Sequence, residues 1–135
     1  MVTHVTDGDT LWVRPSGQTG DVELRLLNLD APEGCQRHGP LAKKALTQRL
    51  LHQTVSVRTH GVDDYQRSLA QVRHHGKDVG AWLVREGHAW SSSYRGKAGP
   101  YEAIEQEARQ ARRGLWAYPD AEEPRAFRRT HGRCR

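Results

Sequence analysis

Two aspartates two positions apart are the first group in this chain of 135 residues that could bind a cation. Asp7 and Asp9 flank Gly8, and residues two apart on extended backbone face the same side. Carboxylate oxygens suit hard cations such as calcium or magnesium. An Asp-Gly pair is also a common turn signal, and taken alone this segment is better explained by a turn.

A second acidic segment, 30–33, reads Asp-Ala-Pro-Glu. Pro32 restricts Ala31 to an extended conformation, so the Ala31 carbonyl could be fixed toward a cation beside the Asp30 carboxylate. Glu33 follows on the same stiffened backbone. A carboxylate held near a metal, but not bound to it, can orient or deprotonate a water molecule.

Two arginines could add a phosphate clamp. Arg25 lies among leucines at 24, 26 and 27, where a charge costs free energy unless it is paired or functional. A structural salt bridge is the competing explanation for Arg25, and an isolated arginine after a turn, such as Arg67, is usually just solvated. Together, however, their planar guanidinium groups match phosphate oxygens, and with a cation they would stabilise charge on an attacked phosphorus. Removing either arginine is expected to slow such chemistry by orders of magnitude, with less effect on folding.

The composition is compatible with a nucleic-acid partner but does not require one. The formal net charge is +5, with 21 basic and 16 acidic side chains and a pI of about 9.6. A basic domain gains affinity for a polyanion by releasing counterions, although the same charge also serves solubility. No apolar run has the length of a membrane span. We expect a secreted or periplasmic protein whose signal peptide is not in this sequence.

The two cysteines, Cys35 and Cys134, allow three states. A disulfide would tie the C-terminal tail to the loop after Glu33, and we prefer it. Two histidines at matching spacing, His38 and His131, would complete a structural zinc site as the second choice. Free thiols are the third.

The pattern of strands and helices predicts one α+β domain that is mainly β. Three helices are expected, opening at Gly39-Pro40, after Asp78 as N-cap, and at Gly99-Pro100. Five short strands with attached helices favour a five-stranded oligonucleotide-binding (OB-fold) barrel. The domain would span residues 1–118, with a tail at 119–135 that is loose or pinned by Cys134. The expected strands are 2–6, 10–14, 22–29, 54–60 and 69–73.

Five segments in order resemble the staphylococcal nuclease-like (thermonuclease) family. The likeness covers about Val2 to Trp116, and each motif is weak alone but specific in this order and spacing. Departures are Gln66, where the family usually has glycine, and Asp64, which is lysine in the best-known member. The matching segments are Asp7 to Thr10, Arg25 to Glu33, Asp63 to Ala70, Leu83 to Ala89 and Ala108 to Trp116.

The resemblance implies an OB-fold nuclease that hydrolyses DNA and RNA with calcium and leaves a 3′-phosphate. By position, calcium would be held by the side chains of Asp9 and Asp30 and by the Ala31 carbonyl, with Asp7 as a supporting acid. Glu33 would be the general base, and Arg25 and Arg67 would hold the scissile phosphate. Tyr65 would hydrogen-bond a neighbouring phosphate, and Tyr94 would stack on a base, with Trp90, expected to be a core residue, close by.

Two other functions stay open at this point. One is a non-catalytic nucleic-acid-binding module of the same fold, although such relatives typically lack the acids or the arginines. The other is a structural or inhibitor-like protein in which Arg25 pairs internally with Glu33. We expect a monomer that acts on DNA and RNA and does not engage a membrane.

Overall fold

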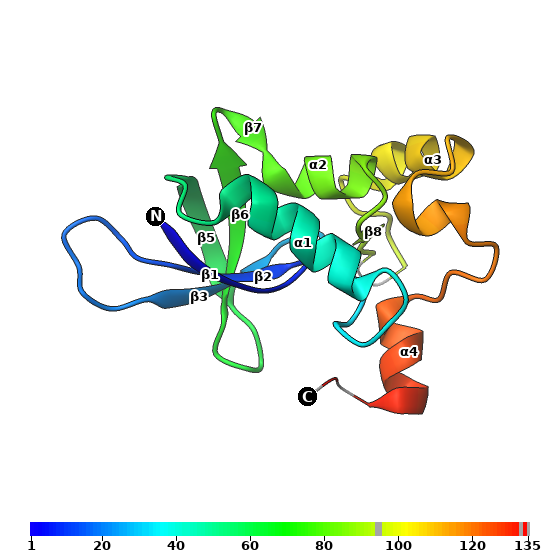
Figure 1. Ribbon diagram of the computed structural model, residues 1–135, viewed down its shortest axis with the longest axis horizontal. Coiled ribbons are helices and arrows are strands. Elements are labelled where there is room, and N and C mark those ends of the chain that lie inside the picture. Colours follow the sequence, from blue (N-terminus) through cyan, green and yellow to red (C-terminus); the bar gives the residue numbers. More distant parts are fainter. Residues whose placement is uncertain (94–95, 133, 135) are drawn as a thin grey trace.

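A six-stranded mixed sheet forms the centre of the computed structural model, which describes residues 1–93, 96–132 and 134 (Figure 1). Its strands follow the order β1-β2-β3-β6-β5, with β7 paired to β6. The β3–β6 pair is parallel and the other pairs are antiparallel. The strands are β1 (Val2–Asp7), β2 (Thr10–Val13), β3 (Val22–Leu26), β5 (Ser56–Val62), β6 (Ser68–His74) and β7 (Lys77–Asp78).

The predicted mixed α+β class is confirmed, but the closed five-stranded barrel is not. Among the described residues the sheet has two ends, β1 and β5, and no strand pairing joins them. The strand expected over 22–29 is divided because Asn28 adopts a left-handed conformation with φ of 71°, which asparagine tolerates better than most residues. The chain then leaves the main sheet, and β4 (Leu29–Asp30) pairs with β8 (Trp90–Ser91) in a separate two-stranded sheet.

The expected helix starts hold well for the first two helices. α1 (Gly39–Leu50) has Pro40 in its first turn, and the Asp78 carboxylate caps α2 (Val79–Arg85) by accepting hydrogen bonds from two backbone N–H groups. The third, α3 (Glu102–Gln110), begins two residues after the expected Gly99-Pro100 start and is followed by the 3₁₀ helix η1 (Gly114–Ala117). A fourth helix, α4 (Pro124–His131), lies in the segment expected to be a tail.

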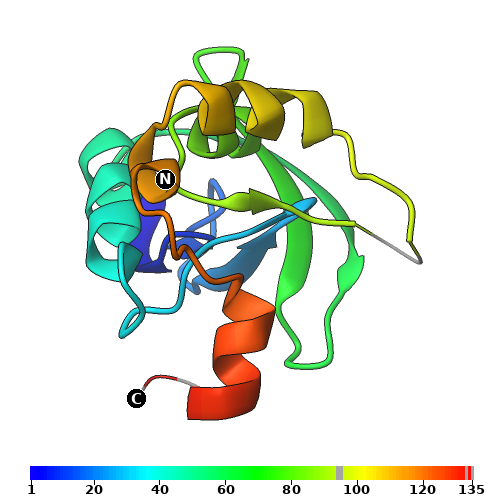
Figure 2. The ribbon, with the colours of Figure 1, turned by 90° about the vertical axis from the view of Figure 1, so that its right-hand side faces the viewer.

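Leucine and valine side chains from the strands and the first two helices form one buried core. α1 lies across the sheet, α2 and α3 lie beyond one end of it, and α4 stands apart from all three (Figures 1 and 2). The largest fully buried side chains include Leu11, Leu24, Leu29, Leu46, Leu50, Leu83 and Leu115. This core fixes the β1–β2 turn and the end of β3, where the candidate catalytic groups begin.

The strand expected over 54–60 is present as β5 (Ser56–Val62), at the exposed edge of the sheet. Every residue of β5 is exposed, and Val57 keeps 39% of its surface. β5 is the last strand of the sheet and has a single neighbour, β6, so its side chains remain open to solvent. In the described part of the chain, no helix is both long and apolar enough to cross a bilayer.

Candidate active site

The β1–β2 turn and the segment after β4 are held together by Asp9. The Asp9 carboxylate is buried and accepts a hydrogen bond of 2.8 Å from the backbone N–H of Ala31. A Cβ atom on Gly8 would lie 2.8 Å from the Ala31 Cβ and 2.9 Å from the Ala42 Cβ. Glycine between the two aspartates is therefore required by close packing, which lets the turn approach both segments.

Arg25 joins these two acidic segments from β3. Its Nη1 donates to the carbonyls of Leu26 and Leu29 at 2.7 and 2.9 Å. Its Nη2 lies 3.3 Å from Asp9 Oδ2 and 3.2 Å from Asp30 Oδ1. Two carboxylates predicted to share a cation thus converge on one nitrogen atom, and the charge among the leucines is paired as its burial requires.

Arg67 is aimed by Asp63, an acid whose positioning role the sequence did not reveal. Asp63 Oδ1 accepts from the backbone N–H groups of Tyr65 and Arg67, and Oδ2 accepts from Arg67 Nε at 2.7 Å. Gln66 takes the left-handed conformation, with φ of 65°, in the position where the family usually has glycine. The turn therefore presents Arg67 despite that difference, although the left-handed backbone is less favourable for glutamine than for glycine.

A groove of about 330 Å³ brings the arginines to one surface. Arg25, Arg67 and Tyr65 all line it, so the two predicted phosphate ligands face the same space. Tyr65 is 58% exposed, and the Arg67 guanidinium carbon lies 5.3 Å from the centre of its ring. Trp90 is buried and packs edge-on against Trp116, so its expected core role is confirmed. Tyr94, the predicted base-stacking residue, lies outside the described residues.

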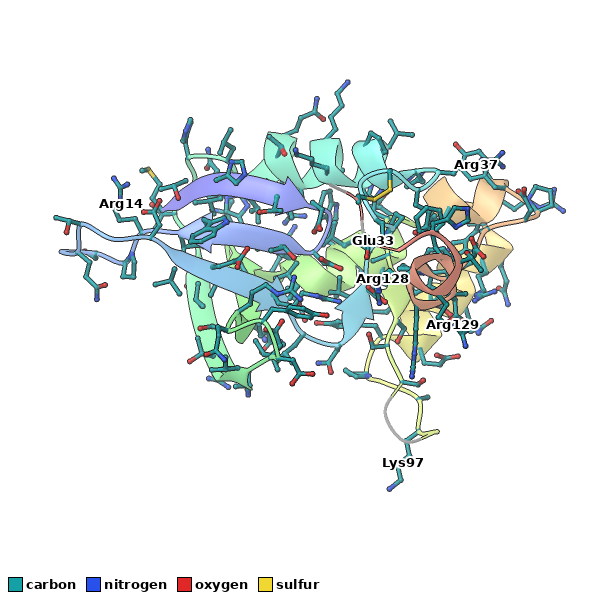
Figure 3. The ribbon with its side chains drawn as sticks, turned by 90° about the horizontal axis from the view of Figure 1, so that it is seen from below. Arg14, Glu33, Arg37, Lys97, Arg128 and Arg129 are labelled. Carbon is teal, nitrogen blue, oxygen red and sulfur yellow. A yellow bond between two sulfur atoms is a disulfide. The ribbon has the colours of Figure 1, made fainter. Side chains whose placement is uncertain are left out.

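Arg128 is the site residue that sequence reasoning missed. It reaches from α4 into the site, where Nη1 donates to Glu33 Oε1 at 2.7 Å and Nη2 lies 3.3 Å from Asp30 Oδ2. Figure 3 shows the labelled Glu33 and Arg128 side chains close to each other, beside α4. The available signals were Pro124 at the first helical position and Gly132 beyond the last, which are common helix boundaries.

Burial and neighbouring charges shift the pKa values of the three aspartates in different directions. Burial and the adjacent Asp9 charge raise the pKa of Asp7 to about 7. Burial opposes ionisation of Asp9 as well, but the Arg25 charge and several hydrogen bonds lower its pKa below the usual value. Burial raises the pKa of Asp30 despite the opposing charges of Arg25 and Arg128. The cluster is thus one of strongly interacting carboxylates, as expected of a functional site.

The residues present fit a hard cation in their chemistry. The donors are carboxylate and carbonyl oxygens, the ligand type of calcium and magnesium, and two of the carboxylates already converge on the positive charge of Arg25. Across residues 1–93, 96–132 and 134, no group of three or more acidic, histidine or cysteine side chains is gathered closely enough to enclose an ion. Asp9, Asp30 and Glu33 are instead paired with guanidinium groups, those of Arg25 and Arg128.

Cys35 and Cys134 form a disulfide with an S–S distance of 2.00 Å, which agrees with the preferred prediction over zinc and free thiols. The bond joins residues 99 apart in sequence. It connects the loop that carries Glu33 to the segment that carries Arg128. Its position therefore bears directly on the geometry of the site.

Known proteins are similar to this sequence over most of its length. Residues 23–118 match the family model described as staphylococcal nuclease homologue. A micrococcal nuclease of Shigella flexneri is 39% identical over 140 residues, covering 95% of this chain and 79% of that protein. Protein ParB of Escherichia coli is 36% identical, covering 95% and 77%. An uncharacterized endonuclease of Haemophilus influenzae is 32% identical, covering 95% and 71%.

The family match contains Arg25, Asp30, Glu33 and Arg67, and the similarity to the relatives extends over nearly the whole chain. Motif order, sheet architecture and these comparisons agree with one another. The chain belongs to the staphylococcal nuclease family.

Proposed function

We propose that this chain is a calcium-dependent nuclease that hydrolyses phosphodiester bonds of DNA and RNA with low sequence specificity. The main support is the convergence of Asp9 and Asp30 on Arg25, at the edge of a groove that Arg67 also lines. Relatives named as nucleases and endonucleases support the same class of activity. The oxygen ligands of the site suit a hard cation, and the family resemblance makes calcium our choice among these.

Asp9, Asp30 and the Ala31 carbonyl would hold the cation, with Asp7 as a supporting acid. When bound, the ion would supply positive charge that stabilises the negative charge developing on the attacked phosphate. Arg25 and Arg67 would bind the other phosphate oxygens. Arg67 is already aimed by Asp63, so it would need little reorganisation as that charge develops. Arg25 Nη1 is anchored by two backbone carbonyls, and its Nη2 would turn from Asp9 and Asp30 to the phosphate when the cation binds.

Glu33 would act as the general base. It would take a proton from a water molecule, whose oxygen then forms the new bond to phosphorus as the bond to the 5′ oxygen breaks. The 5′ oxygen leaves with a proton from solvent, and the product carries a 3′-phosphate. Tyr65, on the same groove, would contact a neighbouring phosphate, and Tyr94 would stack on a base.

The alternatives gain little from the structure. The non-catalytic module was expected to lack acids or arginines, and this chain keeps them all. The inhibitor-like alternative required Arg25 to pair with Glu33, whereas Arg25 pairs with Asp9 and Asp30 and Glu33 pairs with Arg128. We further propose an exported monomer, since disulfides persist mainly in oxidising compartments.

The test is cleavage of single-stranded DNA and of RNA by the purified chain in calcium, with and without a chelator. We expect cleavage that stops on chelation and returns when calcium is added in excess. Magnesium and manganese are run in parallel to establish ion preference. Absence of cleavage with every ion, from a protein whose circular dichroism shows it folded, would remove the proposed activity.

A further inference from the structure

The C-terminal segment is attached to the molecule mainly through the loop that carries Glu33. We call residues 120–132 with Cys134 the strap. Gln36 donates a hydrogen bond to the Glu122 carbonyl, Arg37 pairs with Asp120 at 2.9 Å, and Cys35 is bonded to Cys134. The fourth attachment is the Arg128–Glu33 ion pair. All four reach residues 33–37, so the strap and the general-base loop are mechanically linked.

Arg128 uses the same carboxylate oxygens that a cation and a water molecule would need. Of the two Asp30 oxygens, Oδ1 faces Arg25 and Oδ2 faces Arg128. Glu33 Oε1 is occupied by Arg128 at 2.7 Å. A carboxylate whose oxygens accept hydrogen bonds from a guanidinium is a weaker metal ligand and a weaker base. Arg128 in this position therefore opposes the proposed chemistry.

Arg128 is also less firmly anchored in the site than Arg25. Arg25 lies on a central strand and is anchored by two backbone carbonyls as well as its carboxylates. Arg128 lies on α4, where Pro124 is the single buried residue, and its side chain is 29% exposed. Figure 2 shows α4 projecting away from the sheet and the other helices. Moving the strap would leave the hydrophobic core intact.

We propose that the strap is a disulfide-latched gate: Arg128 closes over Asp30 and Glu33 in the oxidised chain, and release of the strap frees Asp30 Oδ2 and Glu33 Oε1 for a divalent cation and its water. The proposal rests on the proposed function only in naming calcium as that cation. It adds a mode of regulation to the site. Whether Arg128 covers the acids would depend on whether a disulfide between cysteines 99 apart in sequence is oxidised or reduced.

A dithiol reductant can break the disulfide and release the strap without any other reactant. One thiolate of the reductant attacks a sulfur of the Cys35–Cys134 bond, the S–S bond breaks, and a mixed disulfide forms. The second thiol resolves it, leaving two cysteine thiols and an oxidised, cyclic reductant. Cys35 is exposed on the surface, so a reductant can reach the bond.

The test is calcium binding measured by titration calorimetry on the full chain, without substrate. Arg128→Gln removes the gate contact, and Arg129→Gln is the matched control, since Arg129 is exposed on the same helix and carries the same charge. We expect calcium to bind about tenfold more tightly to Arg128→Gln than to wild type, equivalent to about 1.4 kcal/mol. Arg129→Gln should bind as wild type does.

The latch is tested by Cys134→Ser and by treating wild type with a dithiol. Both should raise calcium affinity, and Cys134→Ser should add little in the Arg128→Gln background because the two changes open the same gate. Equal affinities for wild type and Arg128→Gln would overturn the proposal. So would weaker cleavage by Arg128→Gln without tighter calcium binding, since Arg128 would then be a third phosphate ligand.

These outcomes are separable from failure of the proposed function. If Arg128→Gln and the reduced protein bind calcium more tightly but cleave no nucleic acid, the gate stands and the nuclease does not. If wild type cleaves in calcium and the variants bind calcium equally, the nuclease stands and the gate does not. Circular dichroism of each variant confirms that the fold is retained.

Discussion

Replacing Arg25 by glutamine should destabilise the folded chain as well as slow cleavage. The side chain is 17% exposed, its partner Asp9 is 8% exposed, and Asp30 is 19% exposed. Arg25→Gln would leave two mostly buried carboxylates facing each other and two carbonyls without a donor. The sequence alone suggested a smaller effect on folding, but the four contacts of this side chain give a different expectation.

The size of the loss follows from burial. Removing one partner from a buried ion pair costs about 3–5 kcal/mol. We take the lower end, about 3 kcal/mol, because Arg25 and Asp30 keep some contact with water. For a domain of this size, a loss of about 3 kcal/mol lowers the melting temperature by roughly 10 °C.

Urea and thermal unfolding at neutral pH measure this loss, with Arg14→Gln as control. Arg14 forms an ion pair of 2.9 Å with Asp21, but the two side chains are 47% and 30% exposed. Such a surface pair contributes less than about 1 kcal/mol. If Arg25→Gln costs no more than Arg14→Gln, the Arg25 contacts are not the buried network described above.

Three further predictions concern packing, pH and the disulfide. Gly8→Ala should cost about 1–3 kcal/mol through overpacking against Ala31 and Ala42, and a melting temperature equal to that of Gly34→Ala, where the space is open, would contradict this. Burial and neighbouring His88 lower the pKa of His38 to about 4, so the unfolded chain takes up the proton first and stability falls as pH drops from about 6.5 to about 4. In urea unfolding across that range, His38→Asn should show a shallower pH dependence, and an unchanged slope would refute the assignment. Cys134→Ser should cost less than the roughly 4.7 kcal/mol that a loop of about 100 residues predicts, because the strap can leave without unfolding the core, and a full loss in chemical denaturation would show that the strap belongs to the core.

The elements that could be predicted from the sequence have local signals. Pro40 and the Asp78 cap mark helix starts through contacts within one turn of the chain. β4 and β8 could not be predicted, because two-residue strands depend on a partner 60 residues away. α4 was missed because its few apolar side chains, chiefly Ala126 and Phe127, give no buried stripe.

The site residues likewise divide into those that could be predicted from the sequence and those that could not. The acids and arginines were identified by residue type and spacing, and Asp9, Asp30 and Arg25 do lie together. Arg128 was not identified, because nothing near it in sequence resembles a site and its contacts span more than 90 residues. Long-range contacts of this kind are set by where the strap is anchored, and sequence alone left three states open for the anchoring cysteines.

The proposed role of Glu33 as general base is tested by the rate of oligonucleotide cleavage in calcium by Glu33→Gln, compared with wild type. The substitution keeps the size of the side chain and removes its ability to accept a proton. We expect a fall of roughly 10²–10⁴-fold, the range for loss of a general base, in a protein that binds the oligonucleotide and unfolds near the wild-type temperature. A rate within about twofold of wild type would show that Glu33 is not the general base.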